Sequence, residues 1–138
     1  MLDQKTFKMD PVEFPQLKRV TINGKRHYRL SEDSTAQAYP SVTSITSLKS
    51  KEAIKAWRAR VGEEEANRIT TKATRQGTKA HELIEHYLVS DELPTYMPNE
   101  YDLFTRFKNV ADEKIDNIRS IEGQMMSNYL QCAGTADL

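Results

Sequence analysis

The order of strand-like and helix-like patterns is the feature that most limits what this chain can fold into. Residues 18–30 read as a β-hairpin around Asn23-Gly24, a pair that favours a two-residue turn. Apolar residues then recur at helical spacing through most of 39–119. Two short strand-like segments fill 120–138. We therefore predict an α+β fold in which helices separate an N-terminal hairpin from C-terminal strands.

Within the helical region the spacing of apolar residues predicts four helices. Pro40 is expected to end any strand, and Ser41 to cap the first helix. Gly77 is expected to interrupt or bend the third helix, or to mark a close approach of another backbone. The expected helices run from Ser41 to Leu48, from Lys51 to Val61, from Glu63 to about Tyr87, and from Asn99 to Arg119. The inward residues of the last are expected to be Tyr101, Phe104, Val110, Ile115 and Ile118.

The bulk properties are those of one soluble domain. A length of 138 residues fits a single domain, divided into a lead-in and hairpin (1–38), a helical region (39–119) and first core strands (120–138). Residues 1–16 show no period and are expected to be loose. The single cysteine excludes a disulfide within the chain, and no segment resembles a signal peptide or a membrane span. We expect a cytoplasmic, phage-like or bacterium-like protein.

The charges are unevenly distributed although their sum is zero. Residues 49–79 contain nine basic and four acidic residues, whereas 80–122 contain four basic and ten acidic ones. Such neighbouring blocks suit a protein that binds an anion beside a cation, or two ordinary solvated helix faces. Four cations share one helix stripe and could follow a phosphate backbone, unless they only pair with neighbouring glutamates. They are Arg68, Lys72, Arg75 and Lys79.

Two places in the sequence offer metal ligands. His81 and Glu85 are four residues apart, so they share a helix face and could meet a divalent cation, or simply bond to each other. His86 lies five residues from His81, which is one too many for the H-E-x-x-H zinc motif. Asp137 follows the small residues Gly134-Thr-Ala on an expected strand, where a carboxylate can bind a hard metal or merely form a turn.

The order of these elements resembles that of a known nuclease family. The elements are Tyr-Pro-Ser-Val-Thr at 39–43, Trp57, Gly-Thr-Lys-Ala-His-Glu-Leu-Ile-Glu at 77–85, Glu122, and Gly-Thr-Ala-Asp at 134–137. Together they resemble the RecB-type branch of the PD-(D/E)XK nucleases, which includes exonucleases of phages and of mitochondrial genome maintenance. The resemblance covers about residues 39–138.

This resemblance implies a restriction-endonuclease-like core that hydrolyses DNA phosphodiesters with Mg²⁺ or Mn²⁺ and no other cofactor. By position, His81 and Asp137 correspond to metal ligands, and Glu122 to an acidic residue on the preceding strand. Ser41 and Thr43 lie where relatives approach the DNA strand. The implied partner is DNA, as a single strand or an end, with no membrane.

One family motif has no counterpart here. The family continues with a strand bearing an acidic residue, any residue, then lysine, and the nearest pair, Glu113-Lys114, has the wrong spacing on an expected helix. We therefore expect the chain to be inactive alone. Two other hypotheses stay open: a non-catalytic nucleic-acid-binding module, and a helical interaction protein.

Overall fold

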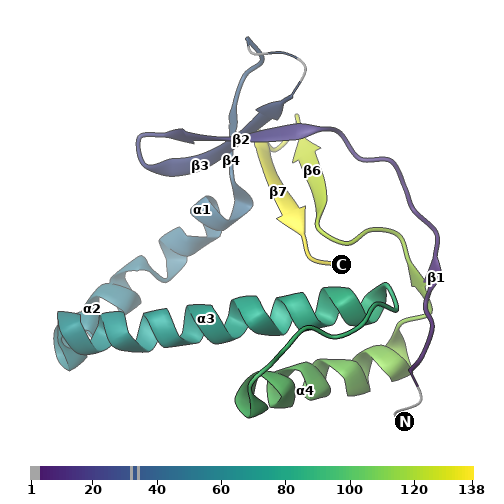
Figure 1. Cartoon of the computed structure of the whole chain (residues 1–138). Helices are drawn as coiled ribbons and strands as arrows, with labels where there is room; N and C mark the ends of the chain where they lie inside the picture. The colour runs from purple at the N-terminus through teal and green to yellow at the C-terminus, as the bar shows by residue number, and fades with distance from the viewer. Residues whose placement is uncertain (1–3, 32, 34) are drawn as a thin grey trace. The chain divides into compact units, whose positions relative to one another are not determined.

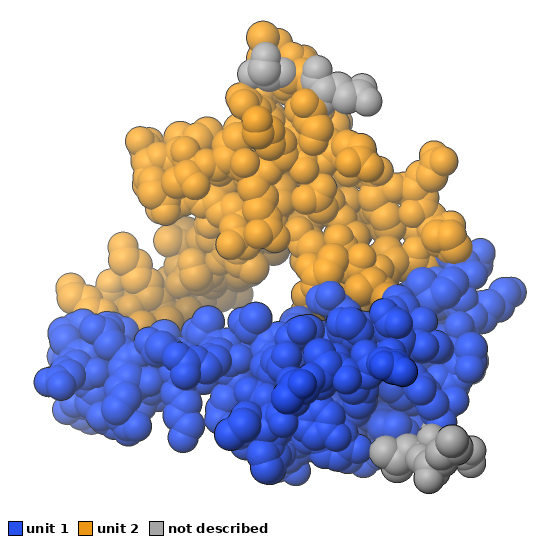
Figure 2. All heavy atoms as spheres, in the orientation of Figure 1, with its two compact units in different colours: residues 1–10, 58–118 blue, residues 11–57, 119–138 orange. Residues whose placement is uncertain are grey.

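The computed structural model describes residues 4–31, 33 and 35–138, and the chain divides into two compact units. Unit 1 consists of 1–10 and 58–118, and unit 2 of 11–57 and 119–138, as the two colours of Figure 2 show. Each unit is thus assembled from segments far apart in the sequence. Helices and short sheets occur together, which agrees with the predicted α+β class.

Unit 1 is built around two helices, α3 (Glu63–Leu88) and α4 (Pro98–Lys114). They pack against each other, and Figure 1 shows them side by side. The Tyr87 ring lies edge-on to Phe7 and Phe104, with centroids 5.6 and 5.5 Å apart. Leu83 and Ala111 are also fully buried. The apolar stripe of α3 therefore forms a real core face, as its helical spacing predicts.

A polar network closes the same core. The Tyr87 hydroxyl donates a hydrogen bond to Asp112 Oδ1, and Lys108 Nζ donates to Asp112 Oδ2 at 2.6 Å. Lys5 Nζ donates to the main-chain oxygens of Asp112 and Ile115 at 2.8 and 2.6 Å. The network joins the N-terminal segment, α3 and α4. It thereby fixes the end of α3 that carries His81 and Glu85.

Unit 2 contains two small sheets. One has the order β2-β3-β4, formed by Leu17–Ile22, Lys25–Leu30 and Tyr39–Pro40. The other is the antiparallel hairpin of β6 (Gly123–Ser127) and β7 (Cys132–Ala136). Leu17, Tyr28 and Ala133 form a buried cluster between them.

The first helix of unit 2 is followed by a turn of tighter helix. The elements are α1 (Val42–Thr46), the 3₁₀ helix η1 (Ser47–Lys49) and α2 (Lys51–Val61), which continues into unit 1. Ser41 occupies the predicted cap position, but its hydroxyl bonds to Thr43 Oγ1 at 2.7 Å and not to a main-chain amide. Pro40 is the last residue of β4, as expected, and lies at a sheet edge where its missing N–H is tolerated.

Three expectations about the helices and the lead-in are wrong. Gly77 does not interrupt α3, which is continuous from Glu63 to Leu88. A Cβ at Gly77 would meet nothing within 4 Å, so no other backbone approaches it closely. The last helix ends at Lys114, not Arg119. Its continuation forms β5 (Asn117–Ile118), which pairs in parallel with β1 (Lys8–Met9) inside the supposedly loose lead-in.

The reason for the early end of α4 is this strand pairing. Ile115 adopts an extended ψ of 124°, and Ile118 is buried in the strand and not on a helix face. The expected inward residue Val110 is 58% exposed, whereas its neighbour Ala111 is buried. No helix in the described part of the chain combines the length and apolar character that a bilayer span requires.

Candidate metal ligands and nucleic-acid interface

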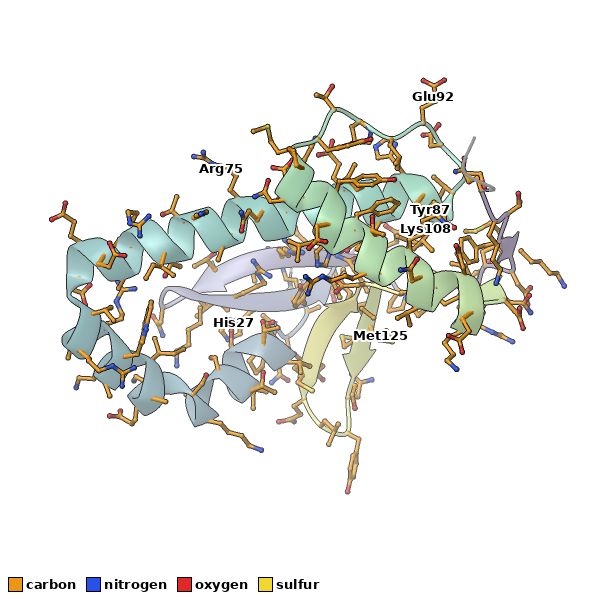
Figure 3. The ribbon with its side chains drawn as sticks, turned by 90° about the horizontal axis from the view of Figure 1, so that it is seen from below. His27, Arg75, Tyr87, Glu92, Lys108 and Met125 are labelled. Carbon is orange, nitrogen blue, oxygen red and sulfur yellow. The ribbon has the colours of Figure 1, made fainter. Side chains whose placement is uncertain are left out.

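The polar side of α3 carries the predicted basic stripe. Ala66, Ala80 and Leu83 occupy the buried side of this 26-residue helix, so the cations between them turn toward solvent. Because the helix is continuous, the four cations have fixed positions relative to His81 and Glu85. Figure 3 shows Arg75 extending outward from α3.

Three of the four predicted phosphate contacts line one hollow in unit 1. A cavity of about 560 Å³ lies between the first half of α3 and the start of α4, and Arg68, Lys72 and Arg75 border it. The amide side chains of Asn67 and Asn99 border it as well. These amides were not anticipated from the sequence, because Asn99 comes from another helix. Amide groups and cations together suit a phosphate or sugar contact.

The four cations of the stripe differ in how far they are neutralised. Arg68 pairs with Glu65 at 2.6 Å, and Lys79 with Glu82 at 2.7 Å. The hydrogen bond from Arg68 lowers the pKa of the Glu65 carboxyl below its usual range. Lys72 and Arg75 have no ion pair with any residue that the structure describes. They are therefore the two cations most available to an anion.

One carboxylate also borders the cavity. Glu100 is 9% exposed, and its Oε2 accepts a hydrogen bond from the Met97 main-chain N–H at 2.7 Å. This bond caps the start of α4. The carboxylate is therefore committed to holding α4.

His81 and Glu85 meet the geometric condition for sharing a cation. A ring nitrogen of His81 and a carboxylate oxygen of Glu85 lie within 4.8 Å of each other. His81 is exposed and Glu85 is half-buried. His86 points elsewhere: its Nδ1 is 3.6 Å from Asp91 Oδ2, too long for a good hydrogen bond. The pair offers two ligand atoms on one rigid helix.

The other two predicted acidic residues meet at one end of the β6–β7 hairpin in unit 2. The Glu122 main-chain N–H donates to the Asp137 carbonyl oxygen at 3.1 Å. Both residues are exposed and lie just outside the strands. The expectation that Glu122 lies on a strand is therefore wrong. Glu122 precedes β6 and has a left-handed φ of 56°. Asp137 likewise follows β7 and is not inside it.

Ser41 and Thr43 occupy different environments in unit 2. Ser41 is 2% exposed and forms an isolated parallel β-bridge with Ala133. Its main-chain N–H donates a hydrogen bond to the Arg26 carbonyl oxygen at 3.0 Å. Thr43 is exposed. Both border a cavity of about 420 Å³ whose other walls include Met125 and Leu130. Of the two hydroxyl residues, Thr43 is the one open to a ligand.

The predicted ligands divide between the units: His81 and Glu85 belong to unit 1, and Glu122 and Asp137 to unit 2. The statement that no acidic-x-Lys spacing occurs near this region is wrong, because Asp112-Glu113-Lys114 has that spacing. It lies on α4, however, and the Asp112 carboxylate is bonded to Tyr87 and Lys108.

Comparison with known proteins gave no match to any family model, to any curated protein or to any solved structure.

Proposed function

We propose that the chain is the N-terminal part of a metal-dependent DNA exonuclease of the PD-(D/E)XK type. In this proposal β6 and β7 are the first strands of the nuclease sheet. His81 and Asp137 would hold Mg²⁺ or Mn²⁺, with Glu85 and Glu122 as supporting carboxylates. The order of these residues along the chain supports it, together with the local geometry of each pair.

The observation that carries the proposal is the placement of two functions on one helix. The cationic face of α3 ends at Lys79, and His81 follows within the same unbroken helix. From Arg75 to His81 the helix advances by about 9 Å. The pair does not share the cationic stripe, because two residues turn a helix by about 200°, so a strand held by the cations would have to pass around α3 to reach His81 and Glu85.

The donor set is chemically suited to the proposed metals. Carboxylates and water are the usual partners of Mg²⁺ and Mn²⁺, and imidazole accompanies them on transition metals. His81 has no hydrogen bond or ion pair with the residues that the structure describes, so its lone pair is available. When bound, the metal would activate water and stabilise charge on the phosphate. The chain's own residues bind and align the strand.

A non-catalytic nucleic-acid-binding module is the second candidate. One observation favours it: residues 112–114, which have the acidic-x-Lys spacing, lie on helix α4 and not on a strand. The cations of α3 would then work without any metal. This second function predicts DNA binding that does not change when Mg²⁺ is removed.

A calorimetric titration with Mn²⁺ separates the two. We expect the intact chain to bind Mn²⁺, and His81→Ala and Asp137→Asn each to weaken binding at least tenfold. His27→Ala, a histidine of β3, is the matched control and should bind like the wild type. Equal affinity in all four proteins, or no binding in any, would reject the metal site and leave the binding module.

Activity forms a second readout. The 138 residues lack the acidic-x-Lys strand, so linear single-stranded DNA incubated with Mg²⁺ should stay intact. Degradation that disappears in His81→Ala would show that the chain needs no further residues. In that case the expectation of inactivity is wrong while the metal assignment stands.

A further inference from the structure

The hairpin of β2 and β3 carries a concentration of positive charge that the proposed function does not use. Residues 17–30 include five Lys or Arg residues and one His, with no Asp or Glu. Unit 2 has nine Lys or Arg residues against six Asp or Glu, whereas unit 1 has eleven against fourteen. The hairpin thus lies in the unit whose net charge attracts an anion, and the stripe on α3 does not.

The strand register separates the hairpin into two faces, since side chains alternate along each strand. Leu17 and Tyr28 share one face and are buried against Ala133. No residue of that buried cluster lies on the opposite face. The cross-strand pairs on the opposite face are Lys18 with Arg29, Val20 with His27, and Ile22 with Lys25. This second face is therefore cationic with an aliphatic centre.

The cations on the hairpin differ in how far they are neutralised. Lys18 lies directly opposite Arg29, an arrangement of like charges that destabilises a hairpin in isolation. Lys18, Lys25 and Arg26 make no ion pair with any residue in the described ranges. Arg29 differs from these three cations, because its charge interacts with that of Asp33. An external anion would remove the unfavourable pairing.

The shape of the hairpin narrows the kind of anion. Each strand has six residues, and the turn at Asn23 and Gly24 has the positive φ values, 51° and 73°, of a tight two-residue connection. Residues 21–26 are all exposed, and Figure 1 shows the turn at the free end of the two strands. Such a ribbon is about 20 Å long. Because β4 pairs with β3 only at His27 and Tyr28, the turn end at 21–26 is two-stranded, and a two-stranded ribbon fits the major groove of B-DNA, which is about 12 Å wide.

We propose that the β2–β3 ribbon binds duplex DNA, with Lys18 and Lys25 of the cationic face, and Arg26 from the exposed turn end of the other face, contacting phosphates on the two sides of the groove. The inference deepens the proposed function and rests on it in so far as both require DNA. In a DNA exonuclease the ribbon would bind the duplex part of the substrate. The α3 face and the ribbon are then separate contacts, one for a strand and one for a duplex.

Fluorescence anisotropy with a labelled short duplex, and with one of its single strands, tests this on the full chain. The test variant is Lys18→Gln/Lys25→Gln/Arg26→Gln. If all three side chains contact phosphates, the dependence of log affinity on log salt should become shallower by about 2.7. Between about 50 and 200 mM salt the wild type should then lose about 40-fold more duplex affinity than the variant.

Two further triple variants serve as comparisons. Lys8→Gln/Arg106→Gln/Lys114→Gln removes the same charge from exposed positions of unit 1 and should change duplex affinity little. Arg68→Gln/Lys72→Gln/Arg75→Gln tests the α3 face and should weaken single-strand binding more than duplex binding. Melting temperatures check that the variants fold. Lys18→Gln alone should not lower the melting temperature, because it removes the repulsion with Arg29.

The outcomes separate the inference from the proposed function. Loss of duplex affinity in the hairpin variant and not in the α3 variant supports the ribbon, and the α3 contact is rejected only if the α3 variant also keeps its single-strand affinity. Loss in the α3 variant alone rejects the ribbon and leaves the proposed function intact. The inference is overturned if the hairpin and control variants change duplex affinity equally. It is also overturned if the hairpin variant aggregates while its duplex affinity is unchanged, because the lysines then only protect a sheet edge. No DNA binding by the wild type rejects both.

Discussion

Replacing Asp112 tests how the end of α3 that bears His81 and Glu85 is held. The Asp112 carboxylate accepts hydrogen bonds from the Tyr87 hydroxyl and from Lys108 Nζ. Figure 3 labels Tyr87 and Lys108. Lys108 Nζ also lies 5.2 Å from the centre of the Tyr87 ring. The side chains of Lys108 and Asp112 are 14% and 30% exposed, so water screens their ion pair only in part.

The magnitude follows from what each substitution leaves behind. Asp112→Ala leaves the hydroxyl of the buried Tyr87 without its acceptor, which costs about 1–3 kcal/mol. Loss of the partly exposed ion pair adds about 1 kcal/mol. We therefore expect a loss of about 2–4 kcal/mol in the free energy of unfolding. Asp112→Asn keeps an oxygen for Tyr87 and should cost only about 1 kcal/mol.

The network also predicts a dependence on pH. Burial raises the pKa of Asp112, but the hydrogen bonds from Lys108 and Tyr87 and the nearby positive charges outweigh it, so the pKa lies below its usual value. A lowered pKa means that the folded state favours the ionised carboxylate. Its stabilisation is complete above the unfolded-state pKa of about 3.9 and is lost as the pH falls through the folded-state pKa. Asp112→Asn should remove this part of the acid dependence.

Urea unfolding followed by circular dichroism, at neutral pH and through the acid range, measures both effects. Asp116→Asn is the matched control, since Asp116 is an exposed aspartate of the same unit. The reasoning is refuted if Asp112→Ala and Asp112→Asn cost the same. It is also refuted if both stay within about 0.5 kcal/mol of the wild type, the range of ordinary surface substitutions.

The remaining predictions concern the α3 face and two glycines. Arg68→Gln/Lys72→Gln/Arg75→Gln should make the salt dependence of single-stranded DNA binding shallower by about 2, and an unchanged slope in anisotropy titrations would contradict the interface. Gly77→Ala should stabilise the chain by about 0.5–1 kcal/mol, because a Cβ there meets nothing within 4 Å inside a continuous helix. Gly62→Ala should instead destabilise it by about 1–3 kcal/mol, because Gly62 has a φ of +90°. Chemical denaturation of both glycine variants gives the signs, and equal signs would count against the described backbone.

Local pattern was sufficient for those elements whose stability is local. The hairpin at 18–30 and the helices at 51–61 and 63–88 follow from turn chemistry and apolar spacing. The pairing of β1 with β5 could not be predicted, because it joins Lys8 to Asn117, residues that no short window contains. The same pairing explains why the predicted last helix was too long.

The candidate site shows the same division. The distance between His81 and Glu85 follows from helix geometry, so their spacing in sequence was enough. The approach of Glu122 to Asp137 depends on the register of β6 with β7, which the sequence does not specify. The cavity beside Arg75 depends on how α3 packs against α4.

The central claim is that His81 binds a divalent cation together with Asp137. Electron spin echo envelope modulation of Mn²⁺ added to the full chain tests it most directly, because a bound imidazole nitrogen modulates the echo of the metal. We expect a nitrogen signal that His81→Ala abolishes and that His27→Ala and His86→Ala retain, with Mn²⁺ binding lost in Asp137→Asn. A signal unchanged in His81→Ala, or full Mn²⁺ binding in Asp137→Asn, would contradict the account.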